Sequence, residues 1–71
     1  MMRNPQRLDA FYESVKKIHK ESFPDWRFGQ LVFNFWYWLS NEKHIDIFFP
    51  EEDETIKLLK EYVKWNEGFS R

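Results

Sequence analysis

The chain has 71 residues, of which 42% are hydrophobic and 32% are charged, and its net charge is −1. This length leaves room for one hydrophobic core, and the composition is typical of a folded domain rather than a disordered chain. The near-neutral charge disfavours a general nucleic-acid binder, and the absence of cysteine excludes disulfides and thiolate metal sites. Aromatic residues make up 21% of the chain, so the small core must use most of them unless a partner covers the rest.

No apolar run approaches the ~18 residues that a membrane-spanning helix needs. The first residues do not resemble a secretory signal peptide, because an amphipathic segment follows them instead of an apolar one. We therefore expect a cytoplasmic protein with no membrane association, organised as a single helical domain over residues 1–71.

The first predicted helix covers residues 4–20. Asn4 can cap the free N–H groups of its first turn, and Pro5 suits the first helical position because it has no N–H to satisfy. Apolar residues and one histidine then recur at steps of three and four, which predicts a single narrow buried stripe. These residues are Leu8, Phe11, Tyr12, Val15, Ile18 and His19.

The second predicted helix covers residues 26–40, after a break at Pro24, and either Ser22 or Asp25 can cap it. Its apolar residues span about 160° of the helical wheel, which predicts a central helix. Gly29 costs about 1 kcal/mol at a helical position, so we expect a neighbouring helix to approach closely there. The predicted buried face consists of Phe28, Leu31, Val32, Phe35, Trp36, Trp38 and Leu39.

Two aromatic residues of the second helix, Phe33 and Tyr37, point away from this predicted buried face. Either the apolar segment 45–49 folds over them, or they meet another chain. Protein interfaces favour aromatic residues, which bury a large area at a small entropic cost. The sequence therefore predicts a protein interface at Phe33 and Tyr37, with Trp26 and Trp65 as further candidates.

Between the second and third helices, Ile45, Ile47 and Phe49 alternate with Asp46 and Phe48, which is the pattern of a short extended segment. No second strand is evident in the chain. We expect an apolar loop that packs over the helices, with strand pairing across a dimer axis as the alternative.

The third predicted helix covers residues 51–66, and Gly68 is its expected stop, with residues 67–71 as a frayed tail. The acidic residues 51–54 lie in its first turn, where the helix dipole favours negative charge. This explanation of the acidic run is preferred to a cation site, because the run lacks the glycine and the spacing of a calcium loop.

The segment Pro24-Asp25-Trp26-Arg27-Phe28-Gly29-Gln30-Leu31 resembles one found in a group of small bacterial and phage proteins of unknown function. Members of that group combine a P-D-x-R-F-G-Q-L motif with a later D-x-F-[FY]-x-E-[DE]-x-E motif, and residues 46–54 fit the second pattern. The resemblance runs from about residue 7 to residue 63. It implies a small helical protein of the kind found in bacterial and mobile-element genomes, and it assigns no activity and no site residues.

The remaining motifs favour structural roles. His19 and His44 are the only imidazoles and lack metal-ligand spacing, and the hydroxyl residues lack any phosphate loop or nucleophile elbow. Asp25 and Arg27, with Gly29, are expected to form a structural motif, in which Arg27 ties the turn to a neighbouring acid such as Asp46 or Glu52. We therefore predict no catalytic residue, no bound metal and no cofactor.

Together these patterns predict an all-α protein, a compact three-helix bundle with an apolar loop before the third helix. The function expected is that of a small non-enzymatic interaction module of phage or mobile-element type, which binds itself or another protein through its aromatic surface. The alternative is a nucleic-acid-binding accessory protein using Lys57, Lys60 and Lys64, which acidic neighbours and the scarcity of arginine disfavour. No small-molecule substrate is evident in the sequence.

Overall fold

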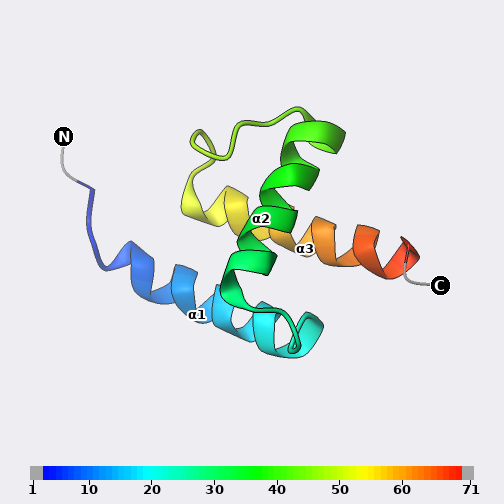
Figure 1. The fold of residues 1–71 in the computed structure, drawn as a ribbon. Coiled ribbons are helices and arrows are strands. Elements are labelled where there is room, and N and C mark those ends of the chain that lie inside the picture. The colour runs from blue at the N-terminus through cyan, green and yellow to red at the C-terminus, as the bar shows by residue number, and fades with distance from the viewer. Residues whose placement is uncertain (1–2, 70–71) are drawn as a thin grey trace.

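The computed structural model describes residues 3–69, and three α-helices make up most of this part of the chain (Figure 1). These are α1 (Arg7–Ser22), α2 (Phe28–Trp38) and α3 (Glu52–Phe69). α1 and α3 pack side by side and run in the same direction, and α2 crosses them (Figure 1). Residues 3–69 contain no strand. The predicted all-α three-helix bundle is confirmed.

Of the two ends of α1, the C-terminal one follows a local signal in the sequence. The Asn4 side-chain oxygen accepts the Gln6 N–H at 3.0 Å in a turn that precedes the helix. The N-cap residue is Gln6, so the prediction that Asn4 caps the helix and that Pro5 is its first residue is wrong. The helix itself begins at Arg7, three residues later than predicted, and extends to Ser22. It ends there because Phe23, which precedes Pro24, has the non-helical angles φ −137° and ψ 54°.

A π-helical turn, η1 (Leu39–Lys43), continues α2 and ends at His44. The Leu39 carbonyl accepts the N–H groups of both His44 and Ile45, the latter at 3.0 Å. His44 has φ 56° and is the only non-glycine residue with a positive φ among residues 3–69. A left-handed residue at this point lets the chain leave the helix while its last carbonyl stays satisfied.

Replacing His44 by glycine is expected to raise the free energy of unfolding by about 1 kcal/mol, because glycine adopts this left-handed conformation without a steric penalty. His44→Val is expected to lower it, since a β-branched side chain is strained at positive φ. Urea denaturation of both variants measures the two changes. Equal stability of the glycine and valine variants would contradict the assignment of strain to His44.

The third helix differs from its prediction at its C-terminal end. It begins at Glu52, one residue after the predicted start, and its first turn holds three acids, Glu52, Asp53 and Glu54, as expected for a helix N-terminus. Gly68 does not stop it, because the helix continues to Phe69. Of the predicted frayed tail 67–71, the first three residues are therefore helical, and residues 70–71 lie outside the described part of the chain.

The core is formed by aromatic and leucine side chains from α2, η1, α3 and the turn after α1. Tyr62 of α3 lies at its centre and contacts five other rings, with centroid distances between 5.3 and 6.5 Å. Its ring neighbours are Phe23, Trp26, Phe35, Trp38 and Trp65. The buried residues of the core are Phe23, Leu31, Phe35, Trp38, Leu39, Leu58, Leu59 and Tyr62.

The prediction of an enclosed central helix is wrong for one side of α2. Phe28, Val32 and Trp36, which were predicted to be buried, are 65%, 39% and 41% exposed. The reason is geometric: α2 packs with one side on the other two helices, and no third element covers its opposite side (Figure 1). A helical wheel gives the width of an apolar face but not the number of neighbours available to cover it.

Candidate functional site

The candidate site is the side of α2 that faces away from α1 and α3, which we call the outer face. At 100° per residue its members occupy one half of the helix surface, opposite the buried Leu31 and Trp38. All are large apolar residues, and all are at least 39% exposed. The outer face consists of Phe28, Val32, Phe33, Trp36 and Tyr37.

Three rings of the outer face already contact one another. The ring centroid of Phe33 lies 5.8 Å from that of Trp36 and 6.2 Å from that of Tyr37. Aromatic pairs at these separations are mutually stabilising. The rings therefore form an ordered cluster, and a partner that docks on it would lose little side-chain entropy in holding them.

The outer face is also free of charge. No residue between Arg27 and Glu42 carries a charged side chain. Interface cores are depleted of charge and enriched in Trp, Tyr and Phe, whereas ordinary exposed helix faces are lined with lysine and glutamate. Composition and exposure therefore agree that this face has the character of an interface core.

The apolar segment 45–49 after η1 does not cover Phe33 and Tyr37, which are 57% and 56% exposed. Ile45 and Ile47 pack against the core, as the alternating pattern predicts. Phe48 and Phe49 are 89% and 80% exposed, so Phe49 does not follow the inward pattern expected of it. The Phe48 N–H bonds to the Asp46 side chain at 3.0 Å, which turns the chain outward at this point.

The other two residues of the predicted interface have different surroundings. Trp26 is stacked on Phe23 at a centroid distance of 4.3 Å, and its carbonyl contacts His19 Nε2 at 2.7 Å. Trp65 packs on Tyr62 and lies partly buried at the edge of the core. Phe33 and Tyr37 therefore lie together on the outer face, whereas Trp26 and Trp65 belong to the packing of the core.

The Asp25–Arg27 turn is not built as predicted. Neither Ser22 nor Asp25 caps α2; the N-cap residue is Arg27, whose N–H donates to the Gln30 side-chain oxygen at 2.8 Å. The Arg27 guanidinium makes no ion pair within residues 3–69. Of its two expected partners, Glu52 pairs with Arg7 instead, at 2.8 Å.

Gly29 also departs from its prediction. A Cβ atom built at this position would meet nothing within 4 Å, so no neighbouring helix of the chain approaches it closely. Gly29 lies between Val32 and Phe33 on the helical wheel, and therefore within the outer face. The chain's own packing gives no reason for a glycine here.

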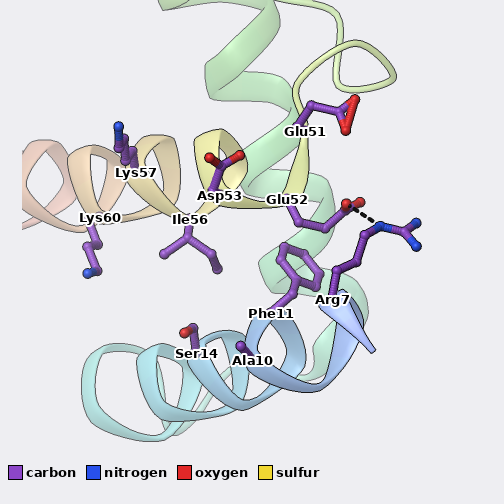
Figure 2. Close-up of a pocket in the computed structure, with 10 residues that line it drawn as sticks. All are labelled: Arg7, Ala10, Phe11, Ser14, Glu51, Glu52, Asp53, Ile56, Lys57 and Lys60. Atoms are coloured by element: carbon purple, nitrogen blue, oxygen red, sulfur yellow. Dashed lines mark hydrogen bonds and ion pairs between the residues drawn. The ribbon is translucent and has the colours of Figure 1, made fainter. Parts of the chain in front are cut away.

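A second surface feature is a groove of about 510 Å³ between the N-terminal halves of α1 and α3 (Figure 2). Phe11 and Ile56 point into it from opposite sides, and the Arg7–Glu52 ion pair lies across one end (Figure 2). The hydrogen bond from Arg7 is the main reason why the pKa of Glu52 is lowered from its ordinary value of 4.5. The pair joins residues 45 positions apart, and the sequence pattern gave no indication of it.

Of the lysines proposed for nucleic-acid binding, Lys57 and Lys60 line this groove. Figure 2 shows Lys60 pointing toward α1, whereas Lys57 points away from it. Both lie beside the acidic start of α3, and Asp53 and Glu51 line the same groove. The groove therefore carries both basic and acidic side chains, and the nucleic-acid alternative stays a prediction.

Within residues 3–69 no three His, Cys, Asp or Glu side chains are grouped so that they could hold a metal ion. In the same part of the chain, no helix combines the length and the apolar character that crossing a bilayer requires.

Comparison with known proteins adds no relative. The chain matches no protein-family model, and neither the curated proteins nor the solved structures contain a significant match to it. The outer face of α2 is therefore the feature of the chain that bears on its function.

Proposed function

We propose that this chain is a small non-enzymatic interaction module that self-associates through the outer face of α2. The observation that carries the proposal is the exposure, on one uncharged helix side, of four aromatic residues and a valine. Isolated exposed hydrophobic residues are ordinary on protein surfaces, but a contiguous aromatic face is typical of a binding surface.

The apolar area that the outer face exposes is of the size expected for the centre of a dimer interface. Aromatic side chains present ~200 Å² each, so at the observed exposures the outer face offers about 500 Å² of apolar surface. Each partner of a standard interface buries ~800 Å². This area usually consists of an apolar centre and a polar rim. The chain exposes 5892 Å² in total, against the ~4,800 Å² expected for a folded monomer of its mass.

The charge pattern favours a second copy as the partner. In a two-fold dimer the same surface occurs on both sides, so a charge close to the axis faces its own like charge. The outer face has no charge to be repelled in this way, and its nearest charged neighbours along the chain are Arg27 and Glu42. A strongly charged partner would find no complementary group on it.

Gly29 supports the same arrangement. Glycine within a helix is less favourable than alanine by up to about 1 kcal/mol, and no contact within the chain compensates for this cost. A helix of a second copy that crosses α2 at this point could approach more closely because the Cβ atom is missing. Small residues allow helix backbones to approach closely in the same way at the helix crossings of membrane proteins.

Sedimentation equilibrium tests the proposal directly. The natural protein is expected to show a concentration-dependent mass, and Phe33→Ala and Tyr37→Ala are each expected to weaken association about tenfold or more. Both side chains are more than half exposed, so each variant is expected to keep its helical circular dichroism. A natural protein that stays monomeric at millimolar concentration, or variants that only unfold, would refute self-association through this face.

Replacing Gly29 by alanine is expected to have opposite effects on folding and association. Alanine favours the helix, so the monomer becomes more stable by up to about 1 kcal/mol, whereas the added Cβ weakens the dimer. Gly68→Ala is the matched control, since Gly68 also lies in a helix with open space around it but is on α3. Stronger association of Gly29→Ala, or an effect on association equal to that of Gly68→Ala, would contradict a close helix crossing at Gly29.

A biological setting is proposed from the resemblance to small bacterial and phage proteins alone. A self-associating accessory or host-modulating protein of a phage or mobile element fits a short helical chain with an aromatic interface. No residue of the outer face is assigned a more specific role by that resemblance.

A further inference from the structure

Beyond self-association, we infer that the chain has a binding site for a quaternary ammonium group. The site is a crevice of about 190 Å³ between the C-terminal end of α2 and the C-terminal half of α3. Four aromatic rings and one carboxylate line it together with two amides. The lining residues are Asn34, Tyr37, Trp38, Asn41, Glu42, Tyr62 and Trp65.

The rings of Tyr62 and Trp65 are stacked, with an interplanar angle of 21°, and the Trp38 ring is inclined to both. The Trp38 ring is inclined by 51° to that of Tyr62 and by 52° to that of Trp65, at centroid distances of 5.3 and 6.3 Å. Trp38 and Tyr62 are almost fully buried, whereas Tyr37 is 56% exposed. The crevice therefore has a fixed aromatic base and a more accessible aromatic rim, and electron-rich ring faces attract cations.

The charges around the crevice favour a cation. Glu42 lies on the rim, and within residues 3–69 it forms no ion pair. The neighbouring ammonium of Lys43 is paired with Glu61 at 2.8 Å and lies 5.9 Å from the Trp38 ring centroid. The Trp38 ring therefore already interacts with a cation of the chain, and Lys43 does not line the crevice.

The size and the lining select a methylated ammonium over a plain one. At ~30 Å³ per water the crevice holds about six waters, which is too little for the drug-sized ligands of ordinary pockets. A plain ammonium has three N–H donors that need acceptors, and the four rings supply few; the acceptors of the lining are the Glu42 carboxylate and the side-chain oxygens of Asn34 and Asn41. A trimethylammonium head has no N–H donor and makes cation–π contacts with its methyl groups. Choline and the side chain of trimethyl-lysine both carry this group.

The experiment titrates the protein with choline at constant ionic strength and follows the indole N–H signals by NMR. The signals of Trp38 and Trp65 are expected to shift with a dissociation constant on the order of 1–10 mM, whereas those of Trp26 and Trp36, outside the crevice, stay in place. A second titration uses a peptide that contains trimethyl-lysine, and the same peptide with unmodified lysine. It distinguishes a trimethylammonium group carried by a protein from that of free choline. The uncharged analogue 3,3-dimethylbutan-1-ol is the chemical control.

Two variants complete the test. Glu42→Gln keeps the size of the side chain and is expected to weaken choline binding about threefold to fivefold, whereas Glu54→Gln, at the far end of α3, leaves it unchanged. Trp65→Leu is expected to weaken binding more than tenfold, provided that its circular dichroism is that of the folded protein. Equal binding of the uncharged alcohol would overturn the inference, as would the absence of shifts at Trp38 and Trp65 up to 50 mM choline. Tyr37 belongs to both the crevice and the outer face, whereas Trp38, Tyr62 and Trp65 line the crevice and are not part of the outer face.

Discussion

Tyr62→Ala is expected to lower the free energy of unfolding by about 3–5 kcal/mol. A domain of 71 residues has a total stability of roughly 4–10 kcal/mol, so this single change removes at least about a third of it. The reason is the position of Tyr62, which is 3% exposed and contacts five other rings of the core. Urea denaturation followed by circular dichroism measures the loss.

The matched control is Tyr12→Ala. Tyr12 is 60% exposed, and its ring contact is with Phe11 on the surface of α1. Its removal is expected to change the free energy of unfolding by less than about 1 kcal/mol. If the two variants were equally stable, Tyr62 would not be the centre of the core.

The ionisation of Tyr62 adds a dependence on pH. Burial raises the pKa of the Tyr62 hydroxyl above its ordinary value of 10.0. The unfolded chain therefore loses this proton more readily than the folded one, so stability is fully present below pH 10 and falls as the pH rises through the folded-state pKa. Tyr62→Phe removes this part of the dependence. Between pH 9 and 11 the natural protein is expected to lose stability more steeply than the phenylalanine variant, and parallel curves would contradict this.

Phe33→Asp is expected to weaken self-association by a factor of 100 or more. The substitution removes a ring that contacts Trp36 and Tyr37 and places a carboxylate within an uncharged face. In a two-fold dimer both copies would carry that charge into the interface without a counter-ion, which costs several kcal/mol. The side chain is 57% exposed, so the monomer is expected to remain folded.

Phe48→Asp provides the matched control for this prediction. Phe48 is 89% exposed, more than Phe33, but it lies in the loop after η1 and not on the outer face. Sedimentation velocity of the two variants at equal concentration measures the difference. Equal weakening by both substitutions would indicate nonspecific association of exposed rings rather than a defined interface.

The parts of the fold that could be predicted from the sequence are those set by neighbouring residues. Pro24 marks the end of α1 through local backbone geometry, and Ile45 and Ile47 pack inward as their alternation indicates. These signals act over a few residues and do not depend on the tertiary arrangement.

The errors concern features set by distant neighbours. Val32 and Trp36 have the spacing of buried residues, but a bundle of only three helices has no fourth element to cover that side of α2. Arg7 and Glu52 are 45 residues apart, so their pairing follows from the packing of α1 on α3. The extra residue of η1 also changes the direction in which the chain leaves α2, and a regular helical wheel does not include it.

The same difference applies to the candidate site. Phe33 and Tyr37 were found because they break the apolar pattern of their own helix. Phe28 was missed because exposure depends on what packs against α2. The crevice between α2 and α3 needs Glu42 and Trp65 together, and these residues are adjacent only once the helices have packed.

The most direct test of self-association through the outer face is an isotope-filtered NOE experiment on a mixture of labelled and unlabelled chains. Such spectra contain signals only between protons of different copies. Self-association through the outer face predicts intermolecular contacts between the α2 helix of the second copy and the ring protons of Phe33, Trp36 and Tyr37. Intermolecular contacts confined to Phe48 and Phe49, or none in a sample at millimolar concentration, would contradict it.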